Sequence, residues 1–263
     1  EQTWNGSSTT AGRCTATISR NGDLVYRMYL QIDGTGGSDK DNPGANYITN
    51  VELEIGGQKI DKHSGDWMEA WTELTEPNPS GTVANNANKA TLFQLMSAMG
   101  GYNSQGAVVP ASVYTIPLQF WFCRNPGLAL PLIALQYHEV KVILEHIIDT
   151  SFATVNSHKL WADYIYLDTD ERRRFAQVSH EYLIEQVQEQ SWSSSSQELN
   201  FNHPVKELVW RKKGTSGTTT PGMATSGNWQ LKLNGHDRFD ARDARYFTRT
   251  QIWEHHSGAG GLD

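Results

Sequence analysis

The sequence of 263 residues contains few cysteines, and this scarcity limits how the fold can be stabilised. Its two cysteines, Cys14 and Cys123, are far apart in the chain and cannot form the disulfide framework of a small secreted domain. A chain of this length does not need one, because it can bury a sizeable hydrophobic core. We expect reduced thiols, and a single Cys14–Cys123 bridge stays open as the alternative.

The sequence also lacks a membrane-spanning run and an excess of basic residues. A transmembrane helix needs about 18 or more apolar residues in a row, whereas the apolar run 128–135 is short and contains Pro131. The formal net charge is −7, and the basic runs 172–174 and 211–213 are brief. Nucleic-acid-binding proteins are usually basic or carry a basic stripe. We therefore expect no transmembrane segment and no direct binding of nucleic acid.

Motifs of catalytic and ligand sites are missing as well. The glycine-rich stretch 34–40 contains Asp39 and is followed by Asp41, so carboxylates would face a bound phosphate. The adjacent His255 and His256 would lie on opposite faces of a strand, where they could not share one metal ion. The sequence contains no zinc-protease helix and no Gly-x-Ser-x-Gly elbow. We predict no catalytic, cofactor-binding or metal-binding residues and no enzymatic activity.

Strand-forming patterns are abundant. The sequence contains 23 glycines and 10% aromatic residues, and apolar residues alternate with polar ones in many short segments, which is typical of an all-β fold. The stretch 133–147 fits both a helical and a strand period, and its β-branched residues favour a strand. The other predicted strands lie within 13–32, 47–60, 112–123, 161–167, 182–188, 198–210, 229–233 and 246–253.

Three short helices are also predicted. Asp66 and Asp168 are candidate N-caps, each with a glutamate three residues later. The first helix, 66–74, places an apolar stripe on one face, and a further helix over 89–99 does the same before it ends at two glycines. The stripes are Trp67, Ala70, Trp71 and Leu74 in the first helix and Leu92, Leu95, Met96 and Met99 in the other. We expect the second of these stripes to be core.

The most apolar stretch, 117–140 (PLQFWFCRNPGLALPLIALQYHEV), closely resembles the signature of the major capsid proteins of nucleocytoplasmic large DNA viruses. This group includes the phycodnaviruses, iridoviruses and mimiviruses. Further segments resemble the same family in the same order, so the resemblance covers essentially the whole chain. These segments are 18–24, 51–61, 166–176, 203–210, 233–239 and 246–256. Within the signature, the turn Arg124, Asn125, Pro126 and Gly127 is expected to shape the core rather than to bind a ligand.

The resemblance implies a double jelly roll, in which two β-sandwiches follow each other in one chain. The first roll would span 1–212 without the family's N-terminal arm, 213–227 would be a linker, and 228–263 would begin a second roll that is truncated. The sequence starts at Glu1 without a signal-peptide pattern, and we expect an internal fragment. The linker is predicted independently by its composition of small and polar residues.

The resemblance also implies a function in assembly. Three chains would form a pseudo-hexagonal capsomer, and capsomers would tile an icosahedral shell in the virion, assembled in the infected host cell. The expected partners are further copies of the chain, neighbouring capsomers and minor capsid proteins, without a cofactor. Loops 34–46 and 76–90 are the candidates for contacts between subunits.

Two alternatives stay open at the level of the sequence. Nine tryptophans, ten tyrosines and acid pairs such as Asp168 and Asp170 would also suit a carbohydrate-binding or carbohydrate-cleaving β-sandwich. In addition, Asn5 begins an Asn-Gly-Ser sequon and is a candidate glycosylation site, although an ordinary surface turn is the favoured interpretation.

Overall fold

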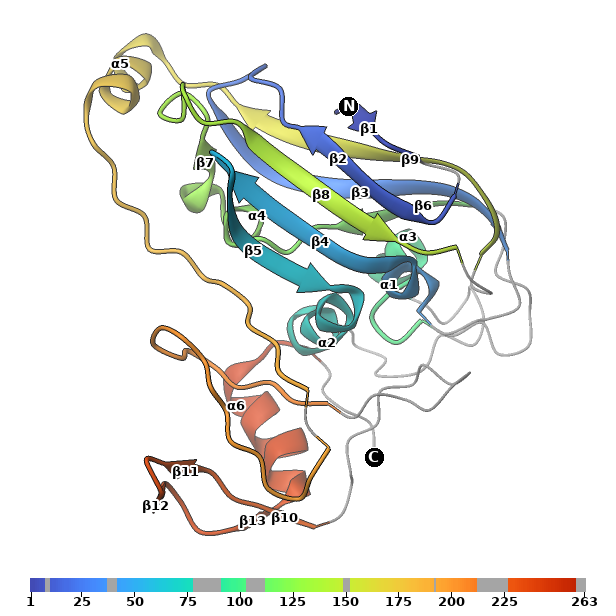
Figure 1. Ribbon diagram of the computed structural model, residues 1–263, viewed down its shortest axis with the longest axis vertical. Helices are drawn as coiled ribbons and strands as arrows, with labels where there is room; N and C mark the ends of the chain where they lie inside the picture. The colour runs from blue at the N-terminus through green and yellow to red at the C-terminus, as the bar shows by residue number, and fades with distance from the viewer. Residues whose placement is uncertain are drawn as a thin grey trace.

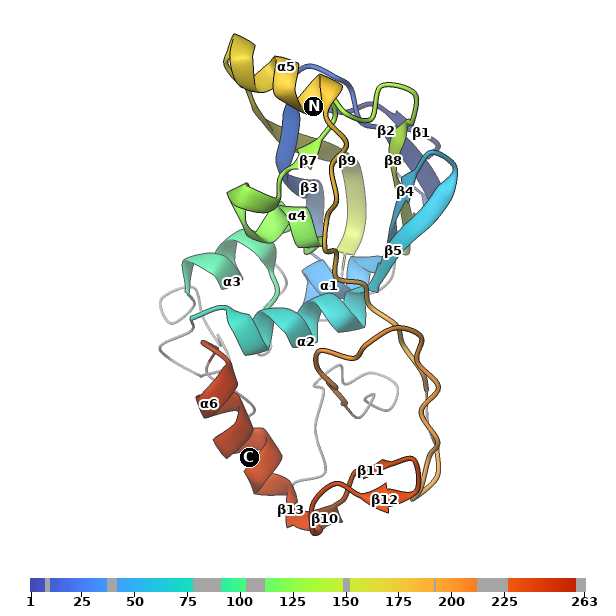
Figure 2. The same ribbon diagram turned by 90° about the vertical axis from the view of Figure 1, so that its left-hand side faces the viewer.

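Two β-sheets lie face to face in the computed structural model of the chain (Figures 1 and 2). The structure describes residues 1–7, 10–36, 42–77, 91–102, 112–148, 152–191, 193–211 and 227–258. One sheet has the order β1-β2-β8-β4-β5, and in the other β3 pairs with β6 and β7 along one edge and with β9 along the other. All of the strand pairs are antiparallel. The strands are β1 (Trp4–Asn5), β2 (Gly12–Thr17), β3 (Leu24–Gly36), β4 (Ile48–Ile55), β5 (Gln58–Ser64), β6 (Ser112–Pro117), β7 (Leu130–Pro131), β8 (Val140–His146) and β9 (Phe152–Ile165).

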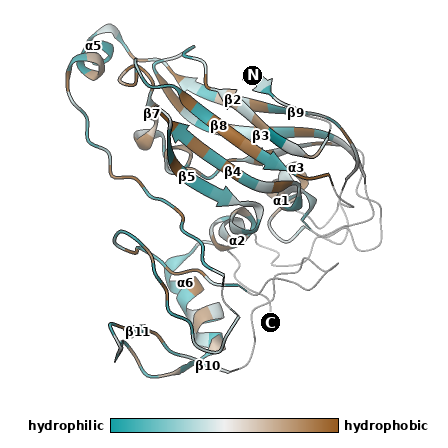
Figure 3. Cartoon of the chain, viewed as in Figure 1, coloured by the Kyte–Doolittle hydropathy of each residue, from teal (hydrophilic) through white to brown (hydrophobic). Residues whose placement is uncertain are grey.

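The core lies between the two sheets. Alternate residues of a strand point to opposite faces, and in β2 this places Cys14 and Ala16 inside with no exposed surface. Val51 and Leu53 of β4, two strands away in the same sheet, are buried in the same core. Hydrophobic segments accordingly lie on the strands, whereas the helix that follows β9 is mostly hydrophilic (Figure 3). The predicted strand pair in 47–60 is confirmed, and it turns at Gly56 and Gly57, both with positive φ.

Short helices close one end of the sandwich and fill its connections. They are α1 (Pro43–Tyr47), α2 (Gly65–Thr75), α3 (Leu92–Ser97), α4 (Trp121–Arg124), a 3-10 helix (Pro126–Leu128), α5 (Thr169–Gln177), a π-helix (Tyr246–Gln251) and α6 (Ile252–His255). Figure 2 shows α1 and α2 across the lower end of the two sheets. Within the described parts of the chain, no helix combines the length and the apolar character needed to cross a membrane.

The predicted N-cap of the helix at 66–74 is wrong. Ser64 caps α2 by accepting a hydrogen bond from the Trp67 backbone N–H at 3.1 Å. Met68 and Thr72 face the core, while Trp67 and Trp71 are only partly buried. The helix α2 has neighbours on two sides: Trp67 lies beside His63 of β5, and Trp71 lies beside His256 of the C-terminal part.

The stripe predicted for 89–99 is also largely wrong, and its first residues, 89–90, lie outside the described part. Leu92 of α3 is 86% exposed, and Leu95 and Met96 are 39% and 40% exposed. Only Met99 of that stripe is buried. Polar Gln94 faces inward instead, because its side-chain nitrogen donates to the Gly100 carbonyl at 2.7 Å while its oxygen completes a capping box with Thr91.

The strand predicted over 112–123 ends earlier than expected. β6 stops at Pro117, and α4 replaces the rest of the strand, so the Arg124 turn joins a helix to β7 rather than two strands. Trp121, Phe122 and Cys123 are all buried. Three consecutive side chains cannot reach the same side of one strand, whereas a helical turn lets all of them reach apolar neighbours.

The glycine-rich loop is only partly a surface loop. Residues 34–36 extend β3, and 43–47 form the largely buried α1, while 37–41 lie outside the described residues, as does most of the second predicted contact loop (78–90). For 43–46 the prediction of a surface loop is therefore wrong. In contrast, the strand in 133–147 and the helix capped by Asp168 are confirmed as β8 and α5.

No strand forms in the described residues of 182–188 and 198–210, where two were predicted. Residues 186–187 lie beside the edge strand β5 through side-chain contacts instead: the Val187 N–H donates to Asp61 Oδ1 at 3.0 Å, and the Gln186 amide donates to the Ile60 carbonyl. Apolar alternation alone does not make a strand when each of these bonds has a side chain on one side, rather than joining a backbone N–H to a backbone C=O.

The C-terminal part of the described chain consists of two small hairpins and a helix. β10 (Asn228–Trp229) pairs with β13 (Arg242–Asp243), and β11 (Lys232–Leu233) pairs with β12 (His236–Asp237). The strand predicted at 246–253 is wrong, because this stretch is helical and continues into α6. The chain then returns to α2, where the Gly258 N–H donates to the Leu74 carbonyl at 2.8 Å.

Candidate functional site

Arg124 is the signature residue that makes long-range contacts. At the end of α4, its Nε donates to the Gln119 carbonyl at 3.0 Å and its Nη1 donates to the Glu185 carboxylate at 2.8 Å. The guanidinium carbon lies 4.5 Å from the centre of the Trp71 ring, which is cation–π distance. Burial lowers the pKa of Arg124 from its ordinary value. Arg124 thus joins α4 to α2 and to the strandless segment after α5.

The other three signature residues form the exposed turn that follows. Asn125 Oδ1 accepts a hydrogen bond from the Gly127 N–H at 2.8 Å, and this contact caps the short 3-10 helix that begins at Pro126. The Leu128 N–H adds a bond to the Asn125 carbonyl at 3.0 Å. The turn is therefore stabilised by its own sequence, while Arg124 connects it to the rest of the molecule.

Asn5, the candidate glycosylation site, lies on β1 and is exposed. Its backbone pairs with Thr15 at the edge of the five-stranded sheet. Gly6 follows with φ of 129°, so the chain leaves the strand directly after the asparagine. The Asn5 side chain is accessible, and whether it carries a glycan stays a prediction.

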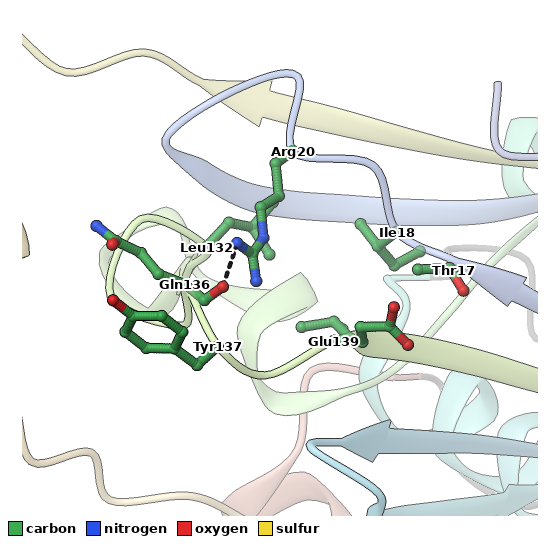
Figure 4. A pocket seen from close by; sticks show the side chains of 8 residues that line it. Thr17, Ile18, Arg20, Leu132, Gln136, Tyr137 and Glu139 are labelled. Atoms are coloured by element: carbon green, nitrogen blue, oxygen red, sulfur yellow. Dashed lines mark hydrogen bonds between the residues drawn. The ribbon is translucent and has the colours of Figure 1, made fainter.

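A hollow of about 330 Å³ lies between the end of β2 and the turns before β8 (Figure 4). Its Arg20 donates to the backbone carbonyls of Leu135, Gln136 and His138 at 2.5, 2.6 and 3.3 Å. This guanidinium is therefore used to hold the turn. Glu139 is the single carboxylate among the lining residues. Hydrolysis of a glycosidic bond ordinarily needs two carboxyl groups, so the hollow does not fit a carbohydrate-cleaving site.

Two carboxyl groups do meet elsewhere, on α2. Glu69 is 2% exposed and accepts hydrogen bonds from the N–H groups of Gly100 and Gly101 at 3.0 and 2.7 Å. Burial, together with the neighbouring Glu73, raises the pKa of Glu69 to about 8. A substrate cannot reach a carboxyl group that is buried in this way, and its bonds instead hold α2 to the turn after α3. The sequence signal for this contact is the pair Gly100 and Gly101, from which the sequence predicts only the end of a helix.

Both cysteines are free and buried, so the alternative of a Cys14–Cys123 bridge is wrong. Cys14 lies close to two buried histidines, His146 and His158, and within the described residues this is the one group of three or more Cys, His, Asp or Glu side chains close enough to hold a metal ion. The sequence pattern did not reveal this group, because its three members lie on three separate strands.

Comparison with known proteins identifies a family along nearly the whole chain. The model of the major capsid protein N-terminus matches residues 1–168, and the model of the large eukaryotic DNA virus major capsid protein matches residues 171–259. The major capsid protein of Pyramimonas orientalis virus is 47% identical over 97% of this chain and 66% of its own length. That of Phaeocystis pouchetii virus is 40% identical over 93% of this chain and 56% of its own length. The chain thus spans between about half and two thirds of these relatives.

A solved structure supports the same assignment. A quasi-atomic description of the PBCV-1 virus capsid matches with a TM-score of 0.74 and 31% identity, over 98% of this chain and 74% of the solved chain. This likeness confirms the predicted fold class, an all-β jelly-roll sandwich with a few short helices. The chain therefore belongs to the major capsid protein family of large eukaryotic DNA viruses.

Proposed function

We propose that this chain builds the capsid shell of a large double-stranded DNA virus, as a structural protein without catalytic activity. Three copies associate into a pseudo-hexagonal capsomer, and neighbouring capsomers tile the icosahedral shell of the virion. The observation that carries this proposal is the 47% identity to a major capsid protein over 97% of the chain. Minor capsid proteins are the further partners, and nucleic acid is not contacted directly.

The described surface supports a role in assembly. Leu92 at 86% exposure, together with Leu95 and Met96, forms an apolar face on α3, and Val113 of the neighbouring β6 is 49% exposed. Leucine and methionine in contact with water favour burial against a partner. The proposal assigns this α3 face to contact with a second copy of the chain, because large subunit interfaces resemble a protein core cut in half.

Light scattering after size-exclusion chromatography tests the assembly. The measured mass should be three times the chain mass, and negative-stain microscopy should show particles with three-fold symmetry. Leu92→Asp should shift the population toward monomer, since a charge would then be buried in the contact. Tyr137→Asp is the matched control, because Tyr137 is 94% exposed and far from α3 in the sequence. A monomer at micromolar concentration, or measurable turnover of a glycan, would contradict the proposal.

The domain division is proposed on the same basis. Residues 1–212 form the first jelly roll with its trailing segment, 213–227 form a linker, and 228–263 begin a second roll. The proposal is supported by the four two-residue strands after 227, which are too short to bury a core of their own. Limited proteolysis should cut first within 213–227. First cleavage within a strand of the sandwich would contradict this division.

A further inference from the structure

Three strands bring a thiol and two imidazoles together inside the sandwich. Cys14 comes from β2, His146 is the last residue of β8, and His158 lies on β9, with 0%, 1% and 3% exposure. One ligand atom from each lies within 4.8 Å of the others. β2 and β8 belong to one sheet and β9 to the other, so the group spans the interior between the two sheets.

The register of the strands explains this convergence. Cys14 pairs with Leu144 and Gly12 pairs with His146, so Cys14 and His146 are diagonal neighbours on the inner face of the same sheet. His158 faces them from β9, and its ring centre lies 4.7 Å from that of His146 at a near-perpendicular angle of 83°. The three side chains are therefore held by backbone ladders rather than by flexible loops.

His146 has one nitrogen available as a ligand. Its Nε2 lies 3.0 Å from the Thr10 carbonyl oxygen, which can only accept, so Nε2 carries the proton. In the neutral ring with this tautomer, Nδ1 carries a lone pair. This Nδ1 is buried and has no hydrogen-bond partner. An N–H bonded to a backbone carbonyl, with the other nitrogen free, is the arrangement that metal-binding histidines usually show.

His158 is oriented in a similar way. Its Nδ1 lies 2.6 Å from the Tyr47 hydroxyl, and its Nε2 lies 3.4 Å from the Cys14 sulfur. Metal–sulfur and metal–nitrogen bonds of about 2.3 and 2.1 Å would place these two atoms about 3.6 Å apart at a tetrahedral angle and about 3.8 Å apart at the trigonal angle of a three-ligand ion. The observed 3.4 Å therefore fits two ligands of one ion with little movement.

We propose that Cys14, His146 and His158 bind one thiophilic transition-metal ion that links the two sheets. The Cys14 sulfur releases its proton to the solvent when the ion binds, and the metal–sulfur bond replaces the contact between the thiol and His158. A thiolate and two neutral imidazoles carry a charge of −1. Cu⁺ would make this buried site neutral with three ligands, whereas Zn²⁺ would leave a positive charge and would need a fourth ligand. Cu⁺ therefore fits the donor set better.

Metal content tests the site directly. The protein is purified from cells supplied with copper or with zinc, desalted under reducing and oxygen-free conditions, and analysed by elemental mass spectrometry. About one copper ion per chain is expected in the wild type. Cys123→Ala is the matched control, because it removes the other buried thiol and should keep full occupancy. Cys14→Ala and His158→Gln should each lose at least nine tenths of the metal.

Thermal unfolding keeps the test decisive when a variant folds poorly. Bound metal should raise the melting temperature of the wild type and of Cys123→Ala, and its removal by a Cu⁺ chelator should reverse the shift. If Cys14→Ala does not fold, the wild type decides: fewer than one ion per ten chains with either metal overturns the proposal. Equal occupancy in folded Cys14→Ala, or loss of metal in Cys123→Ala, would overturn it as well. One zinc per chain and no copper would retain the site but refute the assignment to Cu⁺.

Discussion

Replacing Arg124 by methionine tests whether the signature residue stabilises the fold through the contacts seen here. Methionine keeps an unbranched stem that can pack beside Trp71, but it removes the charge and every donor. The variant therefore loses the bond to the Gln119 carbonyl, the ion pair with Glu185 and the cation–π contact. The sequence predicted that the Arg124 turn shapes the core, but it predicted none of these contacts.

The magnitude follows from how exposed each contact is. A hydrogen bond from a charged group contributes about 1.5–3 kcal/mol, and the cation–π contact about 0.5–1 kcal/mol. The pair with Glu185 adds roughly 0.2–1 kcal/mol, because Glu185 is 42% exposed and screened by water. Desolvation of the guanidinium offsets part of this sum, as the lowered pKa of Arg124 shows. We expect Arg124→Met to lower the free energy of unfolding by about 1–3 kcal/mol.

Urea unfolding monitored by tryptophan fluorescence measures this loss. Glu185→Gln should cost less than about 1 kcal/mol, and the double variant should reveal the coupling of the pair. Protease cleavage within 178–211 should become faster in Arg124→Met, because Arg124 is an anchor for that segment. A loss below about 0.5 kcal/mol, with unchanged cleavage, would refute the reasoning.

Three further predictions concern the core, a buried acid and a helix cap. Phe120→Ala should lower the free energy of unfolding in urea by about 3–5 kcal/mol, because the ring is fully buried and stacked on His63. Tyr137→Ala, at an exposed residue, should change it by less than about 0.5 kcal/mol. A near-neutral Phe120→Ala would show that the site is not close-packed. Glu69 has a pKa of about 8 in the folded chain against an ordinary 4.5, so its contribution to the free energy of unfolding is complete below pH 4.5 and is lost as the pH rises toward 8. Glu69→Gln should flatten this dependence of stability on pH. An unchanged dependence would contradict the assignment. Asp168→Ala removes the N-cap of α5 and should destabilise the helix by about 1 kcal/mol. The backbone amides of α5 should then exchange their hydrogens faster. Unchanged exchange would argue against the cap.

Local signals in the sequence predicted the elements whose stability depends on their own residues. The Asp168 cap predicted α5, the alternation in 13–32 predicted β2 and most of β3, and Gly56-Gly57 predicted the β4–β5 turn. Prediction from apolar periodicity failed where partners in the fold, rather than the residue types of the helix, decide which face is buried. The apolar face of α3 is exposed because Gln94, rather than Leu92 or Leu95, points inward, where its side chain donates to the Gly100 carbonyl.

By itself, the sequence determined the fold class and the family, because strand alternation and collinear motifs are properties of the chain read in order. Only the tertiary structure decided that Arg124 reaches Trp71 and Glu185, that residues 186–189 run along β5 without joining its ladder, and that Cys14 meets two histidines. These contacts join residues more than 50 positions apart. Their existence depends on the packing of two sheets and on strand register, which no local pattern encodes.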